Sequence, residues 1–362
     1  MTFVNYVRTK EEADIHLTIT SASTGGGGTE YTLDFRGRGG FADIGYPLRF
    51  AVPADATVDE RRTQLVAVMR QGLVPFLGRT ALADRLAVEF NEPSRTAGVA
   101  DPWHNWLFSV GADVYATGER SSSSADYCAN VVVNRITELA KLQASFTADV
   151  DQNRYVLEDT TLATTQRSYD GSAFYAHGLS DHFTLGALTT YSSSRYRNVR
   201  HGLSAGPAVE YSILPYSQYT RHEVYVQYQP AVLYRDYYEE TLYEKEREAL
   251  AKHALVLGVT LVRSWGSARA TATGSQYLHD LAKNQLSLYA SAQLRVAGGL
   301  SLTLSGSYAF IHDQLSLRKG GVTEEERLLR LKELATGYSY WVSVGLTYTF
   351  GSVYSNTVNP RF

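Results

Sequence analysis

Hydrophobic and polar residues alternate along most of this chain, most clearly in its last segment. In Tyr338–Phe350, whose sequence is YSYWVSVGLTYTF, every second residue is large and apolar or aromatic, and the residues between them are mostly small and polar. A period of two residues is typical of a β-strand with one apolar and one polar face. Residues 286–296 and 300–310 follow the same pattern. This part of the chain is therefore predicted to form a sheet with two unlike faces.

Segments of this kind recur from Trp103 to Phe350 and are longer than the strands of soluble sheets, which usually run to about 5–6 residues. A strand needs about 9–11 residues to cross a bilayer at a tilt. Such alternation, with aromatic residues at the segment ends, is typical of a transmembrane barrel, because a closed sheet pairs its backbone groups within hydrocarbon. The pattern predicts twelve strands, at about residues 104–118, 125–137, 139–153, 168–178, 182–195, 199–213, 220–235, 250–263, 266–279, 284–297, 299–313 and 337–350.

The connections between these segments differ in length. Short ones are predicted at 179–181, 264–265 and 297–298, and long polar ones at 157–167, 236–249 and 317–336. Short periplasmic turns and long extracellular loops are expected of outer-membrane barrels. An even number of strands then places the preceding residues on the periplasmic side. In the last loop, Thr323 to Glu326 matches a capping box, and spaced leucines follow, which predicts a short amphipathic helix.

Residues 1–93 have a different pattern and are predicted to form a small α/β domain. The glycine run Gly25–Gly28 lacks the Lys and the following helix of a phosphate-binding loop, so it is interpreted as a hairpin tip. Thr57 and Glu60 match a capping box that begins an amphipathic helix ending near Gly78. The expected strands are 14–20, 30–35, 48–52 and 86–90.

The chain is therefore divided into four parts. Residues 94–102 contain small and polar residues with proline and no periodicity, which is typical of a linker. The parts are a periplasmic α/β domain at 1–93, the linker at 94–102, a transmembrane β-barrel at 103–350 and a periplasmic tail at 351–362. The predicted fold class is mainly β, a twelve-stranded antiparallel transmembrane barrel preceded by a small α/β domain.

The composition argues against several kinds of ligand and site. The 362 residues have a net charge of −3 and no cationic run, so the electrostatic footprint of a nucleic-acid-binding protein is missing from the sequence. Cys128 is the single cysteine, which excludes an intrachain disulfide and a cysteine-based metal site. We expect no metal and no cofactor. The 26 tyrosines, twice the number of phenylalanines, suit membrane interfaces, where an apolar ring meets a polar hydroxyl.

Many ionisable residues fall on the polar parity of the predicted strands. A charged side chain on the lipid face costs about 2–4 kcal/mol near the bilayer midplane, so these residues are expected inside the barrel. The lumen-lining candidates are Asp113, Glu119, Asp149, Glu210, Arg235, Arg269 and Arg295. Twelve strands lie between barrels that are filled by side chains and barrels that are open. A water-filled pore and an internal ion-pair network therefore both remain as interpretations.

The last predicted strand has Ser343, Gly345, Tyr348 and Phe350 at a polar-x-Gly-x-x-hydrophobic-x-aromatic spacing. In this motif the chain resembles outer-membrane β-barrel proteins of Gram-negative bacteria, where it is an assembly signal. As a whole the chain is similar to an uncharacterised family of such barrels with a small periplasmic domain in front. The resemblance implies a place in the lipid of the outer membrane, an N-terminal domain in the periplasm and recognition by the barrel-assembly machinery.

The sequence suggests no catalytic residues, so the chain is not expected to be an enzyme. The pairs His279–Asp280 and His312–Asp313 end two predicted strands and raise the alternative of a hydrolase at the extracellular rim, although a polar girdle explains them as well. The first hypothesis is a structural or accessory role in the cell envelope, in which the periplasmic domain docks a periplasmic or outer-membrane protein. The alternative is a narrow, porin-like channel for small polar solutes.

Overall fold

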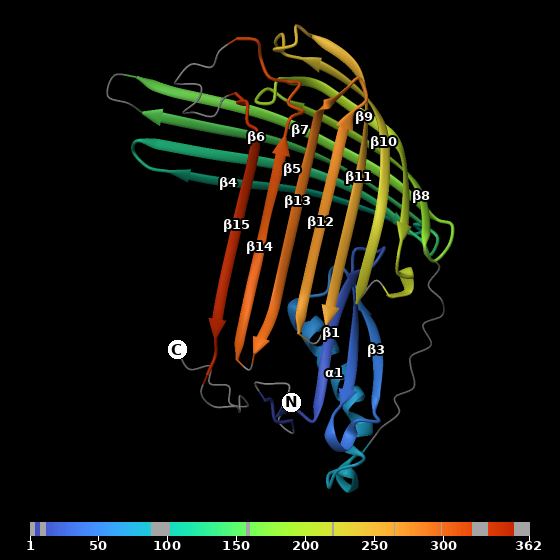
Figure 1. The fold of residues 1–362 in the computed structure, drawn as a ribbon. Helices are drawn as coiled ribbons and strands as arrows, with labels where there is room; N and C mark the ends of the chain where they lie inside the picture. The colour runs from blue at the N-terminus through green and yellow to red at the C-terminus, as the bar shows by residue number, and fades with distance from the viewer. Residues whose placement is uncertain are drawn as a thin grey trace.

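The computed structural model describes residues 4–7, 12–87, 102–156, 160–218, 221–263, 265–297, 299–320 and 332–350. These residues form a three-stranded antiparallel sheet with one α-helix, followed by a twelve-stranded antiparallel sheet (Figure 1). The predicted fold class is confirmed in this respect: the chain is mainly β, and twelve antiparallel strands follow a small α/β unit. In the described part of the chain, no helix is both long enough and apolar enough to cross a membrane.

The small sheet is a hairpin extended by one strand, in the order β1 (Ile15–Ser23), β2 (Thr29–Gly37), β3 (Gly45–Val52). Its core is formed by Leu33 and Phe35 of β2, which pack against Leu73 and Phe76 of the helix α1 (Val58–Leu77). The helix approaches the sheet closely at Gly72, where a Cβ atom would lie 2.1 Å from the Phe35 ring. The apolar residues of β2 and of α1 thus form one core.

The predicted capping box begins α1. The Glu60 backbone N–H donates to Thr57 Oγ1 (3.2 Å), and the Glu60 carboxylate accepts the Thr57 backbone N–H (2.8 Å). The expected strand at 86–90 is not observed at its first two residues, because Leu86 and Ala87 follow a 3₁₀ turn and belong to no strand; residues 88–90 lie outside the described residues. The described part of the small unit therefore has three strands where the sequence pattern predicted four.

The large sheet is a meander in which each strand pairs with the next one along the chain. Its strands are β4 (Trp106–Gly118), β5 (Ser122–Ile136), β6 (Ala140–Val156), β7 (Thr161–Gly178), β8 (Phe183–Ser194), β9 (Val199–Ser212), β10 (His222–Tyr237), β11 (Arg247–Arg263), β12 (Gly266–Tyr277), β13 (Asp280–Ala297), β14 (Leu300–Ile311) and β15 (Tyr338–Tyr348). β7 begins inside the predicted loop 157–167, because its pairing with β6 continues as far as Val156↔Thr161. Backbone pairing does not depend on apolar side chains, so these strands extend past their apolar segments.

The two ends of the large sheet are distinguished by the position of the small sheet. We call the strand ends that face β1–β3 the near end and the opposite ends the far end (Figure 1). The near-end connections are 137–139, 179–182, 213–221, 264–265 and 298–299, and those of the far end are 119–121, 157–160, 195–198, 238–246, 278–279 and 312–337. Short turns occur at both ends, so the difference in length is weaker than predicted, although the longest connection is at the far end. The helix predicted around Thr323 and the tail 351–362 lie outside the described residues.

β4 and β15 are the edge strands of the large sheet, and among the described residues they are not paired with each other. The sheet is strongly twisted, so that β4–β7 run at a steep angle to β11–β15 (Figure 1). Every residue of β15 is exposed. The edge of β15 therefore presents backbone groups that have no partner strand on that side.

Candidate functional site

The register of the large sheet sorts its residues onto two unlike faces. Residues directly opposite each other on paired strands share a face. One row across β4–β11 consists of Gly111, Asn130, Thr147, Asp170, Ser192, Gly202, Arg235 and Glu248. The adjacent row consists of Val110, Val131, Phe146, Gly171, Tyr191, Leu203, Tyr234 and Ala249. We call the face that carries the first row the polar face and the opposite one the apolar face.

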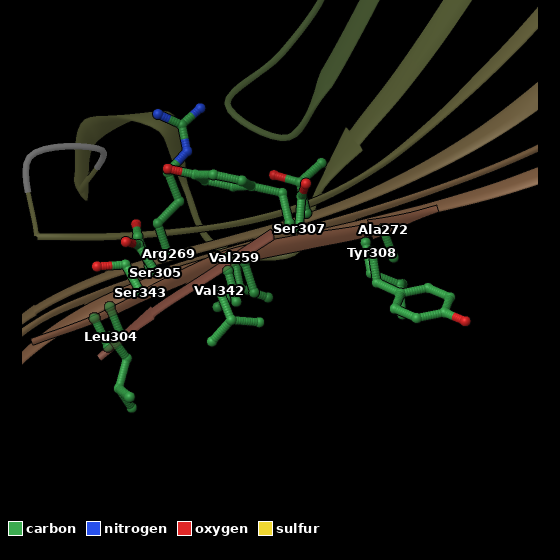
Figure 2. Close-up of a pocket in the computed structure, with 18 of the residues that line it drawn as sticks. Val259, Arg269, Ala272, Leu304, Ser305, Ser307, Tyr308, Val342 and Ser343 are labelled. Carbon is green, nitrogen blue, oxygen red and sulfur yellow. The ribbon is translucent and has the colours of Figure 1, made fainter. Parts of the chain in front are cut away.

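The same division holds for the last five strands. Figure 2 shows Arg269, Ser305 and Ser343 on one side of the sheet and Val259 and Val342 on the other. On the apolar face a shallow depression of about 810 Å³ lies over the small side chains of β12 and β13, which are mainly alanines. Because its exposed lining is almost entirely apolar, this surface suits contact with hydrocarbon better than contact with water.

Aromatic side chains cluster at both ends of the apolar face on β14 and β15. At the far end, the Tyr308 ring stacks on Tyr338 and on Tyr340, with centroids 6.2 Å apart in each pair. At the near end, Tyr348 stacks on Phe350 at 5.6 Å. The strand between Tyr340 and Tyr348 spans about 26 Å at roughly 3.3 Å per residue. For a strand tilted by about 40°, this corresponds to roughly 20 Å across a membrane, which is comparable to an apolar band of about 25 Å between two aromatic girdles.

Most of the charged residues singled out from the sequence lie on the polar face. By register these are Asp113, Asp149, Glu210, Arg235, Arg269 and Arg295. Glu119 lies in the far-end turn after β4, where it accepts hydrogen bonds from the hydroxyls of Ser121 (2.8 Å) and Ser122 (3.1 Å). These bonds lower the pKa of the Glu119 carboxyl. Glu119 therefore lies at the far-end rim of the sheet and not on its polar face.

The acidic residues of the polar face have different partners. Asp113 and Asp149 flank Cys128 in one row across β4–β6. Asp170 forms an ion pair with Arg197 at 2.8 Å. The charges that the described residues carry on this face are therefore only partly neutralised by one another, and carboxylates that have no ion-pair partner are most stable in contact with water.

Glu210 lies close to the near end of β9, and its carboxylate is hydrogen-bonded to a neighbouring turn. Its carboxylate accepts the hydroxyl of Tyr216 (2.8 Å), and the same hydroxyl is 2.8 Å from Thr184 Oγ1. Burial, together with the bond to Glu210, raises the pKa of Tyr216 to about 12. The Tyr216 phenol therefore remains a hydrogen-bond donor at neutral pH, and this bond holds the Glu210 carboxylate on the polar face.

The hairpin of β1 and β2 lies across the near end of the large sheet. On one side Asp34 of β2 forms an ion pair with Arg221, which precedes β10, and Thr18 and Ile19 line a cavity of about 360 Å³ with Arg295 and other residues of β11–β14. The tip of the hairpin reaches the opposite side: a Cβ atom on Gly25 would lie 2.8 Å from the Cβ of Ile136, at the end of β5.

The distance that this hairpin covers follows from its pairing. Asp34 is opposite Thr18, and Thr24, directly after β1, is six positions further along the chain, which is about 20 Å of extended strand. A second contact at the tip is made by Gly27, whose backbone is close to Leu107 at the start of β4. The hairpin therefore extends from the β10–β13 side of the near end to the β4–β5 side, and its glycines allow the close approach at the tip.

At the far end, three connections pack into one cap, formed by residues 195–198, 238–246 and 312–320. Asn198, which is buried, donates from Nδ2 to the carbonyl oxygens of Glu239 and Ser316, both at 2.9 Å. The guanidinium of Arg318, also buried, donates to the carboxylate of Glu239 (3.0 Å) and to the carbonyl of Tyr196 (3.3 Å). Asn198 and Arg318 join segments more than 100 residues apart. No periodicity or motif marks them, and sequence reasoning missed both.

The aspartates of the two His–Asp pairs have different partners. Asp313 lies 3.3 Å from the Nζ atom of Lys252, and Asp280 accepts the backbone N–H of Ala282 at 3.0 Å. His279 and His312 are exposed. Within the described ranges, no group of three or more His, Cys, Asp or Glu side chains could hold a metal ion. Each aspartate thus has a structural partner that accounts for it.

Comparison with known proteins gives structural neighbours only. No protein-family model and no curated sequence matches the chain. Among solved structures, a NanC porin is 11% identical, with a TM-score of 0.34 over 67% of this chain and 100% of the porin. The translocator domain of the autotransporter NalP from Neisseria meningitidis is 13% identical, with a TM-score of 0.33 over 80% of this chain and 98% of that domain. Likeness at this level assigns no function.

Proposed function

We propose that this chain is an outer-membrane β-barrel that conducts small polar solutes through a water-filled lumen. The observation that carries the proposal is the two-faced register: the row from Gly111 to Glu248 is polar across eight strands, and the row beside it is apolar across the same strands. A sheet with these two faces suits hydrocarbon on one side and water on the other. Closure of β4 against β15 would enclose the polar face.

The aromatic clusters support a membrane location. Tyr340 and Tyr348 are separated by about 20 Å across the membrane when the tilt of the strand is included, close to the thickness of an apolar band, and both rings lie on the apolar face, where a hydroxyl can reach the lipid headgroups. The motif that contains Ser343, Gly345, Tyr348 and Phe350 lies in and directly after β15, the last strand. We infer that the barrel-assembly machinery recognises this strand, and that the near end and the small domain face the periplasm.

A lumen filled with water is supported by the charges of the polar face. Asp113 and Asp149 are opposite a thiol and not a cation. Solvation is the ordinary way to stabilise such charges. Because the β1–β2 hairpin lies across the near end, we expect it to narrow the periplasmic mouth and to limit the conductance.

Planar-bilayer recording of the full chain tests this proposal. Discrete conductance steps are expected, with larger steps or a higher open probability for Gly25→Ala, which crowds the hairpin tip against Ile136. Gly26→Ala is the matched control, since a Cβ atom there meets nothing within 4 Å. If neither the unmodified chain nor Gly25→Ala conducts, the channel proposal is wrong.

A structural or accessory role is a second candidate, favoured by the surface of α1. Asp59 and Arg62 form an ion pair at the start of this helix with about three quarters of each side chain exposed. The ion pair between Arg221 and Asp34 fixes the small domain to the large sheet, so a protein bound to α1 would be held at the membrane. A stoichiometric envelope partner that is captured by the full chain and lost on reversing the charges of Asp59 and Arg62 would support this role.

A further inference from the structure

Two depressions on the apolar face form one groove along β11–β13. The first is the depression of about 810 Å³ over the alanines of β12 and β13, and its lining includes Leu257 and Leu288. A second depression, of about 520 Å³, is lined by Leu255 and Leu286, which lie two positions closer to the far end on the same two strands. Residues two positions apart on a strand share a face, so the depressions follow one another along the sheet. We call the two together the outer groove.

The far-end part of the outer groove is polar, although it belongs to the apolar face. Its lining contains His253, Gln276 and Asn284, which form one row across β11–β13 because Gln276 lies opposite both of the others in the register. On β11 the residues before and after His253 on the same face are Ala251 and Leu255, and both are apolar. Polar and ionisable side chains at lipid-facing positions are costly, so this row requires an explanation.

Hydrogen bonds orient the side chains of this row. The hydroxyl of Tyr228 is 3.3 Å from Nδ1 of His253, and Nε2 of His253 is 3.3 Å from Oε1 of Gln276. Because a carbonyl oxygen can only accept, Nε2 carries the proton that Gln276 accepts, and Nδ1 of the neutral ring accepts the Tyr228 hydroxyl. The carbonyl of Gln276 is therefore engaged by the histidine, and its amide nitrogen is left for another acceptor.

Two polar atoms of the row remain open. Within the described residues, Nε2 of Gln276 has no acceptor, and it is not one of the buried atoms that lack a partner, so a molecule in the groove can reach it. Asn284 donates through Nδ2 to the carbonyl oxygens of Leu281 (3.0 Å) and Ala282 (3.2 Å), which leaves its Oδ1 accessible and without a donor from the described part of the chain. The outer groove thus presents one donor and one acceptor on adjacent strands.

The chemistry of the occupant follows from these groups. In the proposed membrane location, a molecule that lies in the groove comes from the bilayer, where an unpaired polar group is unfavourable. Among the described residues, the far-end depression is lined by no Lys, Arg, Asp or Glu, so the part of the ligand that lies there is uncharged. A carbonyl can accept from Gln276 and a hydroxyl can donate to Asn284. A simple acyl ester has carbonyls but no donor, whereas a 3-hydroxyacyl chain has both groups within three carbon atoms.

A second copy of the chain fits the groove less well than a lipid. Two copies related by a two-fold axis would place one depression against the other and leave empty space between them, which close packing disfavours. The small side chains of Ala268, Ala270 and Ala272 instead leave room for a linear hydrocarbon chain along β12.

We propose that the outer groove binds a 3-hydroxyacyl chain of a membrane lipid. The carbonyl of the chain accepts from Gln276, its hydroxyl donates to Asn284, and its hydrocarbon runs over Ala272 toward the near end. The inference rests on the membrane location in the proposed function and not on conduction.

Native mass spectrometry of the full chain in detergent tests the groove with two probes, N-(3-hydroxytetradecanoyl)glucosamine and N-tetradecanoylglucosamine, which differ only in the 3-hydroxyl group. The hydroxylated probe should bind about fivefold more tightly, the effect of one neutral hydrogen bond. Gln276→Leu should weaken the binding of both probes about fivefold, because it removes the donor to the carbonyl. Gln152→Leu, the same change at an exposed position on the apolar face of β6, is the control and should leave both affinities unchanged.

Ala272→Phe provides a second variant, because its ring would occupy the path of the hydrocarbon. It should lower the affinity for both probes, whereas Ala129→Phe, on the apolar face of β5, should not. The proposal is overturned if neither probe binds, if both bind equally well, or if Gln276→Leu and Ala272→Phe both leave the affinities unchanged. A dimer that binds no probe and is disrupted by Ala272→Phe would assign the groove to a second copy.

Probe binding does not require passage of solute. Binding without bilayer conductance would therefore reject the channel and keep the lipid site, and conductance without binding would do the reverse.

Discussion

Arg221, directly before β10, forms an ion pair with Asp34, in the middle of β2. The Asp34 side chain is only 11% exposed and also accepts a hydrogen bond from Arg36 at 2.9 Å. This pair joins the small domain to the large sheet at one side of the near end. The glycine tip of the same hairpin contacts the other side, so the hairpin is held at two points about 20 Å apart.

Removing the Arg221 side chain should release the first of these two points. Arg221→Ala leaves a largely buried carboxylate with one cationic partner instead of two, and we expect a loss of about 1–3 kcal/mol in the stability of the docked hairpin. Hydrogen exchange of the β1 and β2 amides in the full chain measures it. Arg62→Ala removes an exposed ion pair and should change exchange little. Equal exchange in both variants would show that Arg221 does not hold the domain.

Substitution at the glycine tip should release the second point. A methyl group on Gly25 would lie 2.8 Å from the Cβ of Ile136, and relieving such overpacking typically costs about 1–3 kcal/mol. Gly25→Ala should therefore increase the access of a protease to the loop between β1 and β2, whereas Gly26→Ala should not. Equal cleavage of the two variants would contradict the contact between the tip and β5.

Neighbouring residues of β15 should differ in how strongly a charge destabilises the sheet. Val342 is on the apolar face and Ser343 on the polar face (Figure 2). In lipid, Val342→Arg should lower the free energy of unfolding by about 2–4 kcal/mol, and Ser343→Arg by much less, because its guanidinium remains in water. Unfolding of the chain from vesicles measures both. Similar losses would mean that the apolar face is not the lipid-facing one.

The edge strands β4 and β15 should pair in the membrane. Hydrocarbon offers no hydrogen bonds to their free backbone groups, so closure of the sheet is the arrangement that satisfies them. In a Cys128→Ser background, Val110→Cys should form a disulfide with Val342→Cys or Val344→Cys, since all three positions lie on the apolar face. Val110→Cys with Leu255→Cys, on β11, is the control that should not cross-link. No cross-link along the edge would leave the sheet open.

The capping box makes the stability of α1 dependent on pH. Hydrogen bonds from the Thr57 backbone and hydroxyl lower the pKa of Glu60 below its ordinary value of 4.5. Because the pKa is lower in the folded state, this stabilisation is complete above pH 4.5 and is lost as the pH falls through the folded-state pKa. The protection factors of the first α1 amides, which correct for the intrinsic slowing of exchange in acid, should therefore fall as the pH is lowered, and Glu60→Gln should remove most of that dependence. Thr57→Ala should destabilise the helix by about 1 kcal/mol at neutral pH.

The sequence by itself determined the twelve strands of the large sheet, their faces and the start of α1. Alternation with a period of two placed Val342 and Ser343 on opposite faces, and the 3–4 residue spacing with Thr57 and Glu60 placed the start of α1, because these signals depend on neighbours a few residues away. The boundaries of β7 and the absence of a strand at Leu86 and Ala87 were not predictable, since pairing with a partner strand outweighs the local pattern.

Only the tertiary structure decided what lies at the two ends of the sheet. The contact of Gly25 with Ile136 and the ion pair of Asp34 with Arg221 depend on how the small domain is placed against strands that follow much later in the chain. The same is true of Arg235, one of several charged residues on the polar parity, which is distinguished by a buried Nε atom without a partner. Periodicity reports the face of a residue, whereas its partners are set by segments that the fold brings together.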